Sequence, residues 1–286
     1  MGAEMVDGNA CGAAIESSLV GRIAVLPSPP HLAVVIVGDD PASHVYVGAK
    51  ERACKRLGIR STRISLDATT PFHEVLATVQ HLNADSDVNG ILVQSPLPTD
   101  MDEIAITDLI DPAKDVDGFH ALNLGRLVQG DASGLLPCTP SGVMRMLEWA
   151  GIELCGKRVV VIGRSRTVGM PLSLLLAQKG ADATVTIAHS RTLEMAELCR
   201  EADVIIAAVG RSHFLSADWV KPGVVVIDVG VNRVKDDSDK GYHLTGDVHP
   251  DVANIASALS PVPGGVGPMT VAMLMLNTVR ATEMQQ

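Results

Sequence analysis

Three polar side chains, Ser43, Tyr46 and Lys50, lie three and four residues apart in a segment that predicts one helix. Asp40-Pro41 forms a good N-cap and first-position pair at its start, and Gly58 is a good C-cap at its end. The three side chains therefore share one helical face. A tyrosine and a lysine so placed can tune each other's proton affinity in acid–base chemistry. A surface lysine four residues from a tyrosine is also commonplace, so the pair alone leaves both interpretations open.

Two further segments add polar groups to this picture. GILVQ (90–94) predicts a buried strand that delivers Gln94 at its carboxyl end, where sites of parallel α/β proteins lie. The hexapeptide KDVDGF (114–119) carries Asp115 and Asp117 in alternation, so an extended chain would place both on one side. A loop turn is the alternative for that hexapeptide. An amine, a carboxamide and a carboxylate together predict a site for proton transfer.

The segment VVVIGRSRTVGMP (159–171) predicts a strand, a glycine-containing turn and a helix start. Gly163 follows the β-branched run, Gly169 comes later, and Pro171 lies where a helix would begin. Unpaired backbone N–H groups and the helix dipole converge at such a corner and bind anions. Ser165 occupies the second glycine position of the common dinucleotide fingerprint, so a tight strand–helix turn remains the alternative.

The next strand ends in His189-Ser190-Arg191, without the carboxylate that bonds the ribose 2′-hydroxyl in NAD-specific proteins. Arg164 and Arg166 stand in the glycine-containing turn. Guanidinium groups and a hydroxyl suit a 2′-phosphate, which favours NADP over NAD. Solvated loop arginines are the alternative.

A second glycine-rich corner, SPVPGGVGPMTVAML, begins at Ser260 and leads into the last helix. Three glycines in this corner permit close backbone approach, Pro268 is expected to start the helix, and Thr270 falls in its first turn. Such a backbone surface suits a flat ring such as nicotinamide.

Strand-like and helix-like segments alternate along all 286 residues, which is typical of parallel sheets with crossover helices. The region between Asp111 and Pro140 is rich in glycine and proline with little periodicity, and is expected to join two domains with a cleft between them. Strands are expected at 31–38, 61–66, 90–94, 159–163, 183–189, 204–210 and 224–230, and helices at 9–26, 41–57, 71–84, 168–179, 192–201 and 266–284.

Composition excludes several classes of protein. A net charge of −10 argues against a nucleic-acid surface, and no apolar stretch is long enough for a membrane span. The five cysteines are scattered without a CxxC pair or a His-x-x-His cluster, so no metal site is expected. With no signal peptide in view, reduced thiols in the cytoplasm are the expectation.

Seven motifs resemble the bifunctional methylenetetrahydrofolate dehydrogenase/methenyltetrahydrofolate cyclohydrolase family. They are YVGAK (46–50), GILVQSPLP (90–98), KDVDGF (114–119), PCTPSG (137–142), GRSRTVGMP (163–171), GDV (246–248) and PVPGGVGPMTVAML (261–274). The resemblance implies two three-layer α/β domains flanking a cleft, the second of them Rossmann-like, in a homodimer. It implies a folate-binding domain at 1–138, joined by the helix 268–286, and an NADP-binding domain at 139–267.

The resemblance also implies roles for individual residues in oxidation of the folate one-carbon unit by NADP and in its hydrolysis, within one-carbon metabolism and purine biosynthesis. Lys50 resembles the family's catalytic lysine, with Tyr46 and Gln94 beside it, and Asp117 resembles the aspartate that bonds the pterin ring. The other substrate positions are Ser43, Pro96, Leu97, Pro263 and Gly264, and the cofactor positions are Thr139, Gly163, Arg164, Ser165, Ser190, Arg191, Val231, Gly265 and Thr270.

Two residues depart from the family pattern. Ser95 replaces a leucine that is usual after the glutamine, and Asn89 replaces a histidine that is usual before GILVQ. Ser95 alters the pterin pocket in this interpretation. The alternatives are a dehydrogenase without hydrolase activity, a nucleotide sensor without catalysis, and a dehydrogenase for shikimate or amino acids. Intact Tyr46, Lys50 and Gln94 count against the first, and Lys50 and Asp117 against the second. The 114–119 and 261–270 motifs count against the last.

Overall fold

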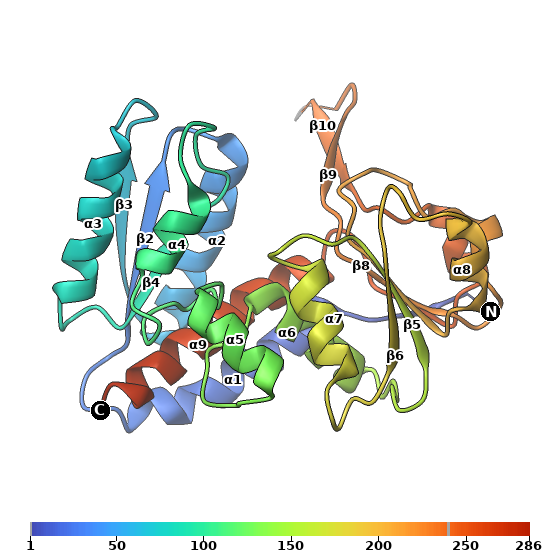
Figure 1. Ribbon diagram of the computed structural model, residues 1–286, viewed down its shortest axis with the longest axis horizontal. Coiled ribbons are helices and arrows are strands. Elements are labelled where there is room, and N and C mark those ends of the chain that lie inside the picture. The colour runs from blue at the N-terminus through green and yellow to red at the C-terminus, as the bar shows by residue number, and fades with distance from the viewer. Residues whose placement is uncertain (1, 239–240) are drawn as a thin grey trace. The chain divides into compact units, whose positions relative to one another are not determined.

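The computed structural model describes residues 2–238 and 241–286, and the chain divides into two compact units (Figure 1). The six-stranded unit comprises Met1–Gly12 and Thr139–Thr270, and the three-stranded unit comprises Ala13–Cys138 and Val271–Gln286. Residues 1–12, which were expected in the first domain, group with the six-stranded unit. The reason is that β1 (Glu4–Met5) pairs in parallel with β11 (Ala258–Leu259).

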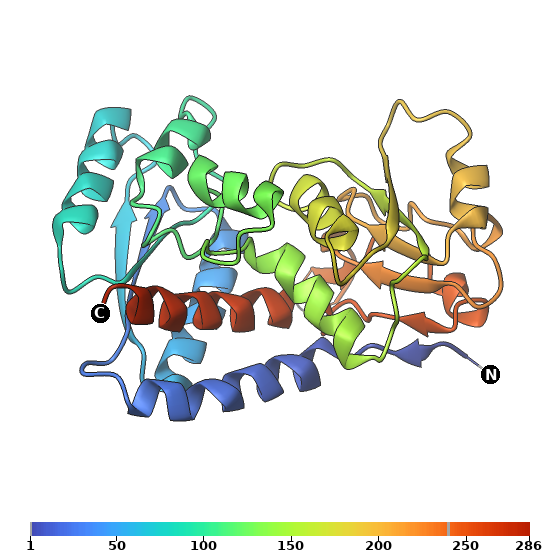
Figure 2. The same cartoon turned by 60° about the horizontal axis from the view of Figure 1, so that its bottom comes forward.

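The three-stranded unit is built on the parallel sheet β3-β2-β4, with β2 (His31–Val37) between β3 (Arg60–Leu66) and β4 (Gly90–Val93). Alternate residues of β2 point to opposite faces. One face packs on α1 (Gly8–Ala24), α2 (Pro41–Leu57) and α9 (Val266–Met284), and the other on α3 (Phe72–Ala84) and α4 (Glu103–Leu109). Figure 2 shows α1 and α9 side by side, where Arg22 pairs with Glu283. This unit is therefore a three-layer α/β fold.

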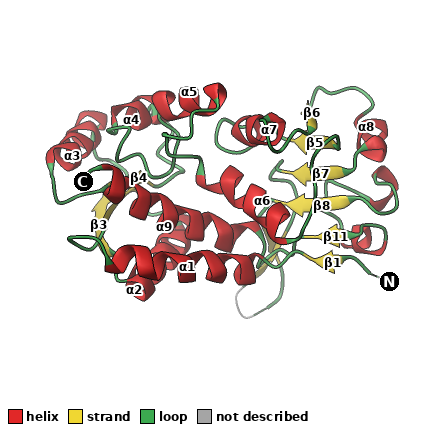
Figure 3. Cartoon of the chain, turned by 90° about the horizontal axis from the view of Figure 1, so that it is seen from below, coloured by secondary structure: helices red, strands yellow, loops and turns green. Residues whose placement is uncertain are grey.

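The six-stranded unit has a parallel sheet in the order β1-β11-β8-β7-β5-β6 (Figure 3). Its further strands are β8 (Val225–Asp228), β7 (Val204–Ala207), β5 (Arg158–Ile162) and β6 (Thr184–Ala188). Helix α7 (Gly169–Ala177) packs on β5 and β6, and α8 (Met195–Glu201) packs against an apolar cluster with β5, β7 and β8. Because all strands run the same way, the loops after β5, β6, β7 and β8 gather at one edge.

Helices in the region 111–140 were not expected, yet the structure has α5 (Ala121–Gln129) and the start of α6 (Cys138–Trp149) there. Gly125 inside α5 and Pro140 in the first turn of α6 obscure the helical pattern, although a first-turn proline costs no hydrogen bond. The hairpin β9 (Asn232–Lys235) and β10 (Tyr242–Thr245), helix α4, and the short helices Ala217–Trp219 and Pro250–Asn254 were also not expected.

One expected helix range agrees with the structure, and the start of another moves by a few residues. Helix α9 spans Val266–Met284 as predicted, with Pro268 in its first turn. Helix α8 begins at Met195 rather than near 192, because Glu194 adopts a left-handed backbone (φ +52°) that ends the preceding turn. The bounds of α2, Pro41–Leu57, are as predicted, with the Asp40 carboxylate accepting from the Ser43 N–H and Gly58 in the left-handed region.

Candidate active site

Lys50 is a buried amine of the three-stranded unit. It lies on α2, its residue is 7% exposed, and its Nζ donates to Oε1 of Gln94 over 2.8 Å. Gln94 follows directly after β4, and its amide nitrogen donates to the Ser95 carbonyl over 2.6 Å. That second bond turns the carboxamide so that its oxygen faces Lys50. The end of a strand thus fixes the orientation of an amine on a neighbouring helix.

Burial shifts the proton affinities of Lys50 and Asp117 toward neutral forms. Loss of solvation lowers the pKa of Lys50, and the negative charge of Asp117 partly opposes that shift. Loss of solvation likewise raises the pKa of Asp117, opposed by the positive charge of Lys50. A buried amine that gives up its proton more readily than a free lysine can serve as a proton acceptor.

Ser43 and Tyr46 share the helical face of Lys50 but differ in their surroundings. Ser43 is 2% exposed, and both its N–H and its hydroxyl donate to Oδ1 of Asp40, at 2.8 and 3.2 Å. Its side chain therefore helps to cap α2. Tyr46 is 39% exposed. Tyr46 and Gln94 were both expected beside Lys50, and the structure shows a hydrogen bond from Lys50 to Gln94.

The hexapeptide 114–119 forms a turn, so the extended arrangement predicted for its two carboxylates is wrong. Asp115 is 1% exposed and accepts from the N–H groups of Gly118 and His120 and from the Asn123 side chain. These bonds hold the turn closed. The Asp115 carboxylate thereby accepts hydrogen bonds from the backbone of its own turn, whereas Asp117 lies next to the Lys50 amine.

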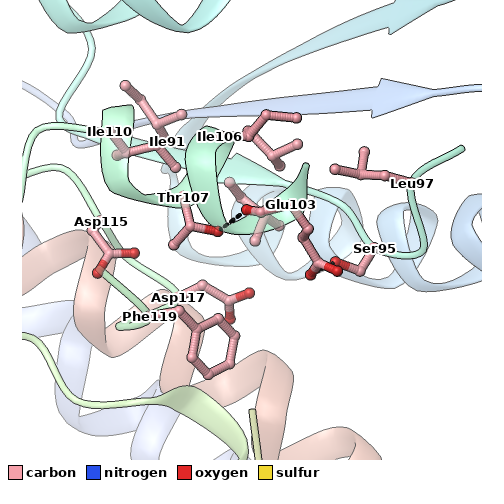
Figure 4. Close-up of a pocket in the computed structure, with 12 residues that line it drawn as sticks. Ile91, Ser95, Leu97, Glu103, Ile106, Thr107, Ile110, Asp115, Asp117 and Phe119 are labelled. Carbon is pink, nitrogen blue, oxygen red and sulfur yellow. Dashed lines mark hydrogen bonds between the residues drawn. The ribbon is translucent and has the colours of Figure 1, made fainter. Parts of the chain in front are cut away.

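A pocket in the three-stranded unit lies beside this group (Figure 4). Aliphatic side chains of β4 and α4 form its apolar wall, and Phe119 contributes an aromatic ring. Its polar lining consists of Ser95, Glu103, Thr107, Asp115 and Asp117. Leu97 lines the pocket, while Pro96 lies between Ser95 and Leu97 and is exposed. The lining of this pocket therefore combines an apolar wall with a few hydrogen-bond acceptors.

Cys138 and Asn277, both buried in this unit, were not predicted as site residues. The Cys138 thiol donates to the Val116 carbonyl over 3.2 Å, and burial raises the pKa of Cys138 well above its usual range. The Asn277 amide donates to the carbonyls of Val116 and Leu136, each at 2.8 Å. These bonds fix the chain on either side of Asp117. Cys138 lies in the PCTPSG motif, but its residue type alone does not predict which groups it contacts in the folded protein.

In the six-stranded unit, the loop from β5 to α7 leaves no room for side chains at two glycines. A Cβ on Gly163, which has φ +134°, would overlap the Ala208 carbonyl, and one on Gly169 would overlap the Gly163 carbonyl. The Ser165 hydroxyl accepts from the N–H groups of Val168 and Gly169, at 3.1 and 3.4 Å. The backbone is thus packed tightly at the start of α7, and Ser165 helps to cap that helix.

The loop after β6 supplies cationic and hydroxyl groups. Ser190 and Arg191 are exposed there, and Arg164 is exposed in the loop after β5. Because β5 and β6 are neighbours in a parallel register, these loops lie at the same edge of the sheet. The last residue of β6 is Ala188, so no carboxylate stands at the position that bonds a ribose 2′-hydroxyl in NAD-specific proteins.

Two buried aspartates tie together other loops at this edge. Asp247 is fully buried and accepts from the N–H groups of Val209, Gly210 and Arg211, at 2.7 to 2.9 Å, and from the Asn232 side chain. Asp228 accepts from three further N–H groups, those of Gly230, Asp247 and Val248. A Cβ on Gly230 would overlap the Asp247 carboxylate, and one on Gly246 would overlap that of Asp228.

These two carboxylates therefore fix the loops that follow β7 and β8. The second loop carries Val231, which is 43% exposed at the predicted cofactor edge. Asp247 lies in the GDV motif, but its role could not be predicted from the sequence, because the N–H groups that it binds are about 36 to 38 residues away in the chain.

The glycine-rich corner before α9 is also closely packed. A Cβ on Gly8 would overlap the Gly265 carbonyl, and Gly264 has φ +108°. The hydroxyls of Thr139 and Thr270 lie 2.9 Å apart, which joins the start of α6 to the first turns of α9. Pro263 and Gly264, which the resemblance assigned to the substrate, belong to this unit together with the cofactor positions.

Within the described ranges, no three His, Cys, Asp or Glu side chains are grouped so as to hold a metal ion. Across the same residues, no helix is both long enough and apolar enough to span a membrane.

Comparisons with known proteins place the chain in a family. Residues 6–117 match the catalytic domain of tetrahydrofolate dehydrogenase/cyclohydrolase, and residues 137–286 match the NAD(P)-binding domain of the same family. The bifunctional protein FolD of Rhodopirellula baltica is 51% identical over 303 residues, covering 100% of this chain and 99% of that protein.

Solved structures agree over nearly the whole chain. The FolD methylenetetrahydrofolate dehydrogenase/cyclohydrolase of Campylobacter jejuni is 43% identical with a TM-score of 0.93, covering 99% of each chain. The Trypanosoma brucei enzyme, solved with NADP cofactor and an inhibitor, is 38% identical with a TM-score of 0.94, covering 99% of this chain and 98% of that one. The chain belongs to the tetrahydrofolate dehydrogenase/cyclohydrolase family.

Proposed function

We propose that this protein carries out two successive reactions on one folate. The first is NADP⁺-dependent oxidation of 5,10-methylenetetrahydrofolate to 5,10-methenyltetrahydrofolate, and the second is hydrolysis of the methenyl compound to 10-formyltetrahydrofolate. The observation that carries this proposal is the buried Lys50 amine, held by Gln94 beside Asp117 and an apolar pocket. Family membership supports it and excludes a shikimate or amino-acid dehydrogenase.

Lys50 is the proton-transfer group of the hydrolysis. The oxygen of water forms a bond to the cationic one-carbon bridge, and neutral Lys50 Nζ accepts a proton from that oxygen. The second proton leaves the same oxygen as the carbonyl forms and the C–N5 bond breaks. One of the two protons passes to N5 and the other to solvent, so charge and atoms balance. Gln94 holds Nζ in place through one N–H and leaves the amine lone pair for this work.

Asp117 binds the pterin ring in this proposal. Its carboxylate accepts N–H donors of the ring, and its charge keeps the pKa of Lys50 from falling further. Pro96 and Leu97 supply apolar contacts in the three-stranded unit, and Ser43 and Tyr46 complete the face around Lys50. Pro263 and Gly264 complete the set of residues proposed to contact the substrate.

Bound NADP⁺ supplies the acceptor for the hydride that leaves the one-carbon bridge. Gly163 and Gly169 allow the strand, turn and helix start to pack closely, because a Cβ on either would overlap a neighbouring carbonyl. Such a glycine-containing corner fits a dinucleotide. Arg164, Ser190 and Arg191 bind the 2′-phosphate, and Ser165 adds its hydroxyl at the start of α7. Thr139, Val231, Gly265 and Thr270 line the nicotinamide end.

The same proposal includes three statements about organisation. The three-stranded unit is the folate-binding domain, and the six-stranded unit is the NADP-binding domain. Two chains form a homodimer, and the protein acts in the cytoplasm. The five cysteines, all without disulfides in this structure, support a reducing compartment.

The test is a product assay. Purified protein receives 5,10-methylenetetrahydrofolate with either NADP⁺ or NAD⁺, and the methenyl and 10-formyl products are followed separately. We expect both products in sequence, with faster turnover on NADP⁺. Accumulation of the methenyl compound at its uncatalysed hydrolysis rate would identify a dehydrogenase without hydrolase activity. Absence of turnover with either cofactor would refute the proposed function.

A further inference from the structure

Lys114, the first residue of the KDVDGF segment, is another buried amine of the three-stranded unit, and the proton transfer proposed above does not use it. Its residue is 7% exposed, the same fraction as for Lys50. Its Nζ donates to the carbonyls of Leu82, Asn83 and Asp85, at 3.2, 2.9 and 2.7 Å. These bonds use all three protons of the ammonium group, a set of donors that a neutral amine lacks. Lys114 is therefore held as a cation at one point of the fold.

The acceptors of this amine lie at the carboxyl end of α3, in its last turn and at its C-cap. The last carbonyls of a helix have no partner within it, and the helix dipole places negative charge there, so an ammonium group is favoured at this end. The Asn83 side chain joins further segments to the same end. Its amide donates to the Leu109 carbonyl at the end of α4, and its oxygen accepts from the Asp111 N–H. The end of α3 thus fixes both α4 and the chain that leads to Lys114.

The main chain of Lys114 is bonded to β4. Its carbonyl accepts from the Ile91 N–H over 2.8 Å, and Ile91 and Asp115 form a parallel bridge. A Cβ on Gly90 would overlap the Val116 side chain, so the two segments are also closely packed. Lys114 therefore joins its turn to the end of α3 through the side chain and to β4 through the main chain.

This junction sets the register of two groups of the candidate site. Gln94, which binds Lys50, lies three residues after Ile91. Asp117 lies two residues after Asp115, the bridge partner of Ile91, and Figure 4 shows both carboxylates at the pocket. Because the bridge is parallel, both segments run toward the same edge of the sheet. A displacement of the turn relative to β4 would therefore change the distance between Asp117 and Lys50.

We propose that Lys114 is a positioning residue, whose three bonds to the end of α3 set the place of Asp117 relative to Lys50 and the bound folate. This inference rests on the proposed function, in which Lys50 moves the proton and Asp117 binds the pterin ring. Lys114 acts through the turn and touches no reacting atom. Arginine is not equivalent here, because a guanidinium spreads its N–H groups over three nitrogens, whereas the three carbonyls converge on one Nζ.

The experiment compares Lys114→Met with wild type, below the temperature at which either protein unfolds. The substitution removes the ammonium group and keeps an unbranched side chain. We expect the KM for methylenetetrahydrofolate to rise about fivefold and the kcat of methenyl hydrolysis to fall about tenfold, with the Kd for NADP⁺ unchanged. The pKa of Lys50, measured by ¹⁵N NMR, should fall below its wild-type value, because the Asp117 charge that raises it is no longer held beside Nζ.

Lys114→Arg is the second variant, and it keeps the positive charge. We expect its KM for methylenetetrahydrofolate to rise about twofold to threefold, because the guanidinium cannot direct three N–H groups from one nitrogen. This variant decides the question if Lys114→Met does not fold. Wild-type values of the KM and of the Lys50 pKa in Lys114→Arg would overturn the inference.

Two control variants separate positioning from stability and from charge. Val75→Ala removes buried methyl groups from α3, and Lys55→Met removes an exposed lysine of the same unit. Both should keep the wild-type KM, kcat of hydrolysis and Lys50 pKa. A Lys114→Met protein that loses stability as Val75→Ala does, but keeps those three values, would show a merely structural lysine and overturn the inference. If the wild type neither binds nor turns over folates, the proposed function itself fails.

Discussion

Two carboxylates, Asp247 in the six-stranded unit and Asp117 in the three-stranded unit, are stabilised by different kinds of partner. In the six-stranded unit, Asp247 accepts from three backbone N–H groups and one side-chain amide. In the three-stranded unit, Asp117 lies beside the Lys50 amine and lines a pocket. Burial raises the pKa of Asp117 and also that of Asp228, the second backbone-bound carboxylate of the six-stranded unit, the latter to about 6. A raised pKa therefore does not by itself distinguish a catalytic acid from a structural one.

The kind of partner makes the distinction. A carboxylate bonded to several backbone N–H groups holds loops in place, because moving its charge or proton would leave those groups unpaired. A carboxylate whose charge is balanced by a buried amine keeps acceptor positions for a ligand. The charge of each group also shifts the pKa of the other. The carboxylates of the six-stranded unit thus hold its loops rigid. In the three-stranded unit, the Lys50–Asp117 pair is placed for proton transfer and ligand binding.

Among changes in the three-stranded unit, removal of the Lys50 amine should have the largest effect on activity. We expect Lys50→Met to lower the rate of methenyl hydrolysis by about a hundredfold to ten-thousandfold, the range for a lost proton-transfer group. The affinity for NADP⁺ should stay unchanged. Stopped-flow measurement of methenyl consumption, with cofactor binding in parallel, checks both statements.

The control for that change is Lys55→Met, which removes an exposed lysine from the last turn of the same helix. Its hydrolysis rate should match wild type. Loss of NADP⁺ affinity in Lys50→Met, with hydrolysis intact, would show that Lys50 serves the cofactor and would break the comparison between the units.

In the six-stranded unit, Asp247→Ala should chiefly reduce the stability of the protein. Three backbone N–H groups lose their acceptor, and we expect the free energy of unfolding to fall by about 3 kcal/mol or more. Urea unfolding measures this loss. Glu197→Ala, at an exposed acidic residue of α8, should change the same quantity by about 0.5 kcal/mol or less. A stable Asp247→Ala protein would mean that the loops do not depend on this carboxylate.

A change at Gly246 tests the same loops without removing charge. A Cβ there would overlap the Asp228 carboxylate, so we expect Gly246→Ala to lower the free energy of unfolding by about 1 to 3 kcal/mol. Gly21→Ala is the matched substitution in α1, where the new Cβ would meet no atom within 4 Å. It should raise stability by about 0.5 to 1 kcal/mol, because alanine favours helix. Equal melting temperatures for the two variants would contradict the overlap.

The smallest effect concerns the pH dependence of hydrolysis. Lys50 acts as the neutral amine, so kcat should rise with pH through its lowered pKa, below the usual value of about 10.4. Asp117→Asn removes the negative charge that raises this pKa, so the inflection should move to lower pH, by about one unit or less. Asp100→Asn, which removes the charge of an exposed carboxylate, should leave the inflection in place. A shift to higher pH would refute the pairing of Lys50 with Asp117.

Local signals in the sequence predicted several elements of this fold. The bounds of α2 follow from Asp40, Pro41 and Gly58, whose capping preferences act within a few residues. Helix α9 was predicted at 266–284, and the structure confirms it. Helices α5 and α6 were missed, because Gly125 and Pro140 interrupt the pattern while distant contacts stabilise the helices.

In the candidate site, too, some features follow from local sequence and others depend on tertiary packing. Ser43, Tyr46 and Lys50 share a face because spacing along one helix fixes it. The sequence also placed Gln94 at the end of a strand, but the Lys50–Gln94 bond spans 44 residues and needs the folded sheet. The Ser95–Glu103 bond and the N–H groups around Asp247 depend equally on tertiary packing. Spacing in the chain predicts which side chains are available, and packing decides their partners.

The proton affinity of Lys50 is the most direct test of the view that this pocket is built for proton transfer. A protein labelled with ¹⁵N-lysine, titrated by NMR and assigned with the Lys50→Met variant, reports the pKa of this single amine. We predict a value clearly below the ordinary lysine value of about 10.4, and a further decrease in Asp117→Asn. A Lys50 pKa at or above 10.4 would contradict the account, because the amine would then remain protonated and could not accept a proton from water.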